Sequence, residues 1–151
     1  MDPAGIYARE SATLDRYVQI GVAGAKLLQV TFPETPAAEA DDDHPLLDRL
    51  EDAIGGEAVT FEDVDVAVTL PSVQRDVLQE LRSVPYGESV TVETLARATP
   101  TIADPEAGRD AVEGALRANP TPIVVPGHRV SDGPQSAPRA VVSHLRSVEG
   151  I

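Results

Sequence analysis

The chain has 151 residues, enough for one domain or for two small domains that share an interface. Its formal charge is −13, and eleven of its twelve basic residues are arginines, with Lys26 as the single lysine. Such a surface suits concentrated salt, which screens self-repulsion, so we expect a salt-adapted (halophilic) cytoplasmic protein rather than an ordinary acidic one. The absence of cysteine excludes disulfides, thiolate zinc sites and thiol nucleophiles.

Histidine spacing and hydropathy argue against two further classes of protein. His44, His128 and His144 are far apart in the sequence, so we expect no metal site. No apolar run approaches the ~20 residues of a membrane span. The N-terminus, with Asp2, lacks the pattern of a signal peptide. We therefore expect a soluble monomer with no metal, no cofactor and no membrane contact.

The first half of the chain has the patterns of a small sheet with one helix. Residues 5–11 and 16–32 predict three strands, with a turn at Gly24 between the last two. Residues 44–56 place apolar side chains at the spacing of one helical face and end in glycine. Residues 61–70 alternate valines with other residues, as a half-buried or edge strand does.

The second half has helical patterns. Residues 71–84 keep their apolar side chains on one side of a helix. Residues 91–98 predict a short helix capped by Thr91. Residues 104–119 predict a further helix, with Asp104 as its cap. Two short helices joined by a loop are typical of a helix-turn-helix.

The two halves, which we expect to be separate domains, differ in charge. Residues 1–70 hold fifteen acidic and four basic residues, a net charge of −11. Residues 71–151 hold ten acidic and eight basic residues, a net charge of −2. The second half therefore repels a polyanion less than the first half does.

A proline-rich run, NPTPIVVPGHRV (residues 119–130), follows the last predicted helix. Its prolines fix the backbone and remove N–H donors, so the run is neither a helix nor a central strand. Together with VPYGESVTVETLA (residues 84–96) and LRSVEG (residues 145–150), it resembles the O6-alkylguanine-DNA alkyltransferase family. The resemblance implies an α+β fold. The implied fold has a ribonuclease-H-like N-terminal domain, made of an antiparallel sheet with one helix. Its C-terminal domain is helical and winged-helix-turn-helix-like.

The resemblance also implies the chemistry of this site. In the family, a cysteine between the last proline and the histidine takes the alkyl group from a flipped guanine, and a histidine and a glutamate draw away its proton through water. Here that position is Gly127, and the relay positions are His128 and Glu149. We expect no alkyl transfer and a structural role for the imidazole–carboxylate pair. Asn119 matches a hinge residue that joins the recognition helix to the proline-rich run.

The family's second helix lies in the minor groove and inserts an arginine where the flipped base leaves the stack. Counting back from Asn119 places Asp110 at the position of this arginine, and Glu113 at a position where the family has a small residue. Counting forward from Pro105 places Arg109 there instead. The apolar positions of the helix favour the first count. Acidic side chains at these positions would repel phosphates.

Two further features depart from the family pattern. The tyrosine that helps to rotate the target phosphate matches Val92, and two glycines of the lid over the base pocket match Ala137 and Pro138. The resemblance thus assigns DNA or lesion contact to Val92, Arg109, Asp110, Glu113, Gly114, Arg117, Asn119, Pro126, Gly127, Arg129 and Ser136.

We predict a non-catalytic protein that binds O6-alkylguanine in double-stranded DNA, with extra room for an adduct above Gly127 and a repair protein as a further partner. The alternative is a degenerate family member that serves as a structural or protein-interaction domain without DNA binding. A third hypothesis, alkyl transfer to Ser131 or Ser136, lacks an evident activating base.

Overall fold

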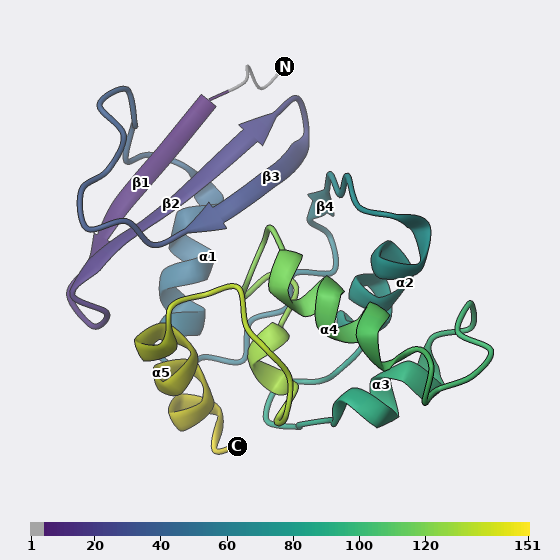
Figure 1. Cartoon of the computed structure of the whole chain (residues 1–151). Coiled ribbons are helices and arrows are strands. Elements are labelled where there is room, and N and C mark those ends of the chain that lie inside the picture. The colour runs from purple at the N-terminus through teal and green to yellow at the C-terminus, as the bar shows by residue number, and fades with distance from the viewer. Residues whose placement is uncertain (1–4) are drawn as a thin grey trace.

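The computed structural model describes residues 5–151 as a four-stranded sheet beside a group of helices (Figure 1). The strands are β1 (Gly5–Ser11), β2 (Arg16–Ala23), β3 (Lys26–Thr31) and β4 (Asp65–Val66). The helices are α1 (Pro45–Ile54), α2 (Ser72–Leu81), α3 (Val92–Ala98), α4 (Arg109–Ala118), the 3-10 helix η1 (Gly127–Arg129) and α5 (Arg139–Glu149). The expected α+β class is confirmed, whereas the ribonuclease-H-like and winged-helix labels stay predictions.

The sheet follows chain order, β1-β2-β3-β4, and its first three strands are antiparallel. The range predicted for the fourth strand, residues 61–70, was too long. Within this range only Asp65–Val66 (β4) form a strand, which pairs parallel with the start of β3, so the sheet is mixed. Residues 61–64 form a turn instead, and the Arg82 guanidinium donates to the carbonyls of Phe61 and Val64 at 2.6 and 2.8 Å.

The helices α1, α2 and α3 lie within their predicted ranges, and the Thr91 hydroxyl accepts from the N–H of Thr94 at 3.1 Å. The helix predicted from residue 104 was wrong at its start, because α4 begins at Arg109. Asp104 instead closes a separate turn, accepting from the N–H of Gly108 through its carbonyl. The chain turns tightly there, since a Cβ at Gly108 would lie 2.3 Å from Ile102 Cγ2.

No element was predicted after residue 130, yet Arg139–Glu149 forms α5. Its buried residues Val141, Val142 and Leu145 have helical spacing, and Gly150 ends the helix in the left-handed conformation. Figure 1 shows α5 next to α1, on the side of the molecule away from α2 and α3.

Two clusters of buried apolar side chains hold these elements. The first lies between the sheet and α1 and includes part of α5 together with Ile123 and Val124. The second lies among α2, α3 and α4 and includes Val125 and Val130. The proline-rich run therefore passes from one core to the other between adjacent residues. A domain boundary near residue 70 stays a prediction.

The proline segment, residues 119–126, turns where it crosses between the cores. The N–H of Val125 donates to the carbonyl of Thr121 at 2.9 Å, and the N–H of Val30 in β3 donates to the carbonyl of Pro120 at 2.9 Å. Ile123 has a φ of +77°, which costs a β-branched residue on the order of 1–3 kcal/mol. The burial of Ile123, which is 4% exposed, offsets this strain.

Within residues 5–151, no helix has both the length and the apolar character needed to cross a membrane. The same residues contain no group of three or more histidine, cysteine, aspartate or glutamate side chains placed to hold a metal ion. Asp2, on which the argument about the N-terminus rests, lies outside the described residues.

Thr121 is fully buried, and its hydroxyl has no hydrogen-bond partner among residues 5–151. Because an unpaired buried hydroxyl costs about 1–3 kcal/mol, we expect Thr121→Val to raise the free energy of unfolding by about 1 kcal/mol in urea denaturation. The matched control is Thr99→Val, which should destabilise, because the buried Thr99 hydroxyl donates to the Leu95 carbonyl at 2.8 Å. Lower stability for Thr121→Val would contradict the prediction.

Candidate functional site

A buried network of hydrogen bonds surrounds the carboxylate of Glu149, at the end of α5. Its side chain is 4% exposed and accepts from His128 Nε2 at 2.5 Å and from Arg129 Nε at 2.8 Å. The backbone N–H of Gly87, which has a φ of +80°, donates a further bond at 3.1 Å. The carboxylate thus joins α5 to η1 and to the turn before α3.

The charge of this network follows from its hydrogen bonds. Burial by itself raises the pKa of the Glu149 carboxyl, but bonds from His128, Arg129 and Gly87 outweigh it and lower the pKa to about 2. An ionised carboxylate only accepts, so the proton of the shared bond belongs to His128 Nε2. In a neutral imidazole, Nδ1 is then the nitrogen able to accept a proton.

Arg129 and Tyr86 extend the network toward the first half of the chain. Arg129 Nη1 donates to the carbonyl of Val84 at 2.8 Å, and its guanidinium carbon lies 5.7 Å from the centre of the Tyr86 ring. The Tyr86 hydroxyl lies 2.8 Å from the carbonyl of Gly56 and 3.1 Å from that of Val148. Arg129 is therefore engaged inside the protein rather than presented to a ligand.

Gly127 lies between two carboxamide side chains. Asn119 ends α4 and joins it to the proline segment, since its Nδ2 donates to the Val125 carbonyl at 2.9 Å and its Oδ1 accepts from the N–H of Thr121 at 3.1 Å. A Cβ at position 127 would lie 3.4 Å from Asn119 Nδ2 and 3.3 Å from Gln135 Oε1. The extra room expected above Gly127 is thus already occupied by Gln135.

Gln135 is the site residue that the sequence analysis missed. Its Nε2 donates to the carbonyl of Gly127 at 2.8 Å and lies 3.5 Å from the carbonyl of Gly133. The side chain folds back onto η1 from the loop between η1 and α5, in which the resemblance assigns ligand contact only to Ser136. This contact is tertiary, so no local pattern in the sequence indicates it.

The first part of this loop is fixed independently of Gln135. The Asp132 carboxylate accepts from the N–H of Val92 at 2.7 Å. Gly133 is packed so tightly that a Cβ there would lie 2.5 Å from Leu116 Cδ1. Val92 itself is fully buried in the second core, so its side chain is not presented to a ligand.

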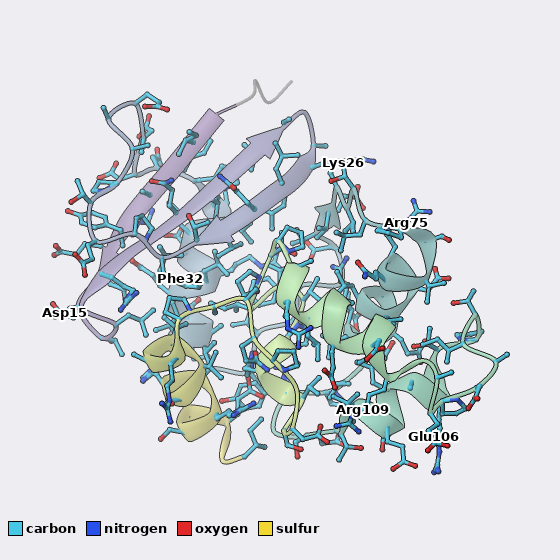
Figure 2. All side chains as sticks on the ribbon, viewed as in Figure 1. Asp15, Lys26, Phe32, Arg75, Glu106 and Arg109 are labelled. Atoms are coloured by element: carbon cyan, nitrogen blue, oxygen red, sulfur yellow. The ribbon has the colours of Figure 1, made fainter. Side chains whose placement is uncertain are left out.

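The helix α4 carries charged side chains that are partly neutralised within the helix. Arg109 and Asp110 are exposed in its first turn, and Arg117 is exposed in its last. Between them, the Glu113 carboxylate accepts from Arg109 Nε at 3.0 Å and lies 3.5 Å from Arg117 Nη2. Figure 2 shows Arg109 at the end of α4 next to α3, with Glu106 on the adjoining loop.

The remaining predicted contact residues lie in three different environments. Gly114 faces α2, because a Cβ there would lie 2.8 Å from Gln74 Nε2. Pro126 is buried and borders a cavity of about 220 Å³, whose other walls include Tyr86. Ser136 is exposed beside the start of the proline segment.

Comparison with known proteins extends this picture. Residues 72–137 match the family described as 6-O-methylguanine DNA methyltransferase, DNA binding domain. The methylated-DNA–protein-cysteine methyltransferase of Methanopyrus kandleri is 36% identical over 108 residues, covering 69% of this chain and 77% of that protein. The protein of the same name from Mus musculus is 41% identical over 87 residues, covering 53% of this chain but only 39% of its own length.

Solved structures share the fold. Mycobacterium tuberculosis O6-methylguanine methyltransferase matches with a TM-score of 0.73 at 20% identity, covering 97% of this chain and 91% of that chain. The structure of Mycobacterium tuberculosis OGT in complex with DNA matches with a TM-score of 0.72 at 22% identity and the same coverage. The chain therefore has the fold of the O6-methylguanine methyltransferases. The sequence match to the Methanopyrus kandleri protein shows the family as well as the fold: the chain belongs to the methylated-DNA–protein-cysteine methyltransferase family.

The charge of Glu149 should make stability depend on pH. Folding lowers the pKa of Glu149 to about 2. The carboxylate therefore stabilises the folded state above its unfolded pKa of about 4.3, and this contribution is lost as the pH falls through the folded value. We expect Glu149→Gln to lower the free energy of unfolding by about 3 kcal/mol at neutral pH, and the deficit to shrink between about pH 5 and pH 2.

Urea denaturation of both proteins across this pH range measures the effect. The matched control is Glu93→Gln, because the Glu93 side chain is 61% exposed and its ion pair with Arg97 lies on the surface. The control should lower stability by less than about 1 kcal/mol. A deficit for Glu149→Gln that does not change with pH would contradict the assignment of the buried charge.

Proposed function

We propose that this chain binds O6-alkylated guanine in double-stranded DNA and transfers no alkyl group from it. The observation that carries the proposal is Gly127 in the sequence PGHRV. The family name specifies a protein cysteine as the acceptor, and this chain contains none. Glycine offers no nucleophile, although the neighbouring His128–Glu149 pair is kept. Because such binding leaves the lesion in place, we further propose a repair protein as a second partner.

DNA as the partner is supported by the comparisons and by charge. The matched domain is described as DNA-binding, and one structural neighbour was solved in complex with DNA. Residues 71–151 carry a net charge of only −2, and α4 exposes Arg109 and Arg117. We further propose, from the charge of −13 and the single lysine, that the protein works as a cytoplasmic monomer in a salt-rich cell.

The second candidate function is a structural or protein-interaction domain without DNA binding. It is favoured by α4, where Asp110 is exposed and Glu113 is paired with both arginines of the helix. Acidic groups on a helix that faces phosphates weaken binding to DNA. Lesion-selective binding by the intact chain would exclude this candidate.

Alkyl transfer to a serine has less support from the geometry. The Ser131 hydroxyl donates to the carbonyl of Val90 at 3.3 Å, and Ser136 is exposed on the loop. Within residues 5–151, neither hydroxyl is hydrogen-bonded to His128, so His128 activates neither of them.

Fluorescence titrations in concentrated potassium chloride test the proposal. We expect a duplex containing one O6-methylguanine to bind at least about tenfold more tightly than the same duplex with guanine. After incubation, intact-protein mass spectrometry should detect no added methyl group. Equal affinities would favour the second candidate, and an added methyl mass would contradict the non-catalytic assignment.

We expect Glu113 to weaken binding of this protein to DNA of any sequence. Glu113→Gln frees Arg109 and Arg117 and removes one negative charge from α4, so we expect both duplexes to bind about fivefold more tightly at moderate salt. The matched control is Glu34→Gln, which makes the same charge change at an exposed position in the loop after β3. A gain no greater than that of the control would show that α4 does not meet the phosphates.

A further inference from the structure

We infer that Gln135 is a gate over the base site: its carboxamide occupies the space above Gly127 in the free protein and must swing away before a flipped base reaches position 127. The identity of the ligand rests on the proposed function. The gate itself rests on contacts between the loop and η1.

In the closed position, both the nitrogen and the oxygen of the Gln135 carboxamide lie beside Gly127. Its Nε2 donates to the carbonyl of Gly127 at 2.8 Å, and its Oε1 would lie 3.3 Å from a Cβ at Gly127. Asn119 Nδ2 closes the other side, 3.4 Å from the same point. Gly127 is itself buried, and any group that approaches it on this side must displace one of the two amides.

Of these two amides, Gln135 is the one that can move. Asn119 is 4% exposed and bonds both Val125 and Thr121, so its displacement would detach α4 from the proline segment. Gln135 is only half-buried. The carbonyl of Gly127 also accepts from the N–H of Val130 at 3.1 Å, so it keeps a partner when Gln135 leaves.

The open position has room for the side chain. Gln135 also borders a cavity of about 400 Å³ between the loop and α5, with Ser131, Ser143 and Arg146 among its walls. These polar side chains can receive a carboxamide that has left Gly127. The backbone need not follow, because Asp132 holds the first part of the loop to Val92 and Gly133 is packed against Leu116. Opening therefore requires only rotation of one side chain.

Only the open protein can accept a flipped base, so the apparent affinity is the intrinsic affinity multiplied by the fraction of open protein. Opening breaks one neutral hydrogen bond, which corresponds to roughly a fivefold loss of affinity. Duplex that binds without base flipping does not meet this penalty. Removing the gate should therefore tighten binding of the lesion and leave binding of undamaged duplex unchanged.

The gate is testable without DNA, because the chain has no cysteine. Gly127→Cys places a single thiol beneath Gln135, and its rate of reaction with 5,5′-dithiobis(2-nitrobenzoate) reports access to position 127. We expect the double variant Gly127→Cys/Gln135→Ala to react roughly fivefold faster than Gly127→Cys. Gly127→Cys/Gln79→Ala is the matched control, since Gln79 is an exposed glutamine of α2. Equal rates in all three proteins would overturn the gate.

Titration of the parent and Gln135→Ala with both duplexes provides a second test that does not depend on the folding of Gly127→Cys. Lesion affinity should rise roughly fivefold in Gln135→Ala, with undamaged duplex unchanged. A fall in lesion affinity would overturn the gate and assign Gln135 to ligand contact. If the thiol reacts faster in the double variant but no protein prefers the lesion, the gate stands and the proposed function fails.

Discussion

One buried carboxylate, that of Glu149, joins the segments that meet at the candidate site. It accepts from His128, Arg129 and the backbone of Gly87, and thereby fixes η1 against the end of α5. A buried charge that loses its partners is strongly destabilising. The His128–Glu149 pair therefore has a structural role that does not depend on a nucleophile at position 127.

The surface of the candidate site is governed by contacts that the protein makes with itself. Gln135 covers Gly127, and Glu113 pairs with Arg109 and Arg117. Under the proposed function, both are contacts that DNA displaces, one at the base and one at the phosphates. The proposed binding of DNA is therefore a competition with these internal contacts.

Much of this arrangement was readable in the sequence, and the failures have physical causes. Strand alternation, helical spacing and the cap at Thr91 are local signals, so β1 to β3 and α1 to α3 were predicted. Asp104 also has the pattern of a cap, but residues 104–108 close a separate turn and α4 begins only at Arg109. The helix α5 had clear apolar spacing and was overlooked. Gln135 was beyond prediction, because only the folded chain brings its side chain over Gly127.

The composition of the first core has a consequence for biosynthesis. The sheet and α1 are made early, but their apolar face is completed by Ile123, Val124, Val141 and Leu145, which leave the ribosome late. Until then the nascent sheet exposes hydrophobic surface, and its closure depends on contacts between the two ends of the sequence. A chain whose translation stops before α5 would be an aggregation-prone intermediate and a substrate for chaperones and proteases.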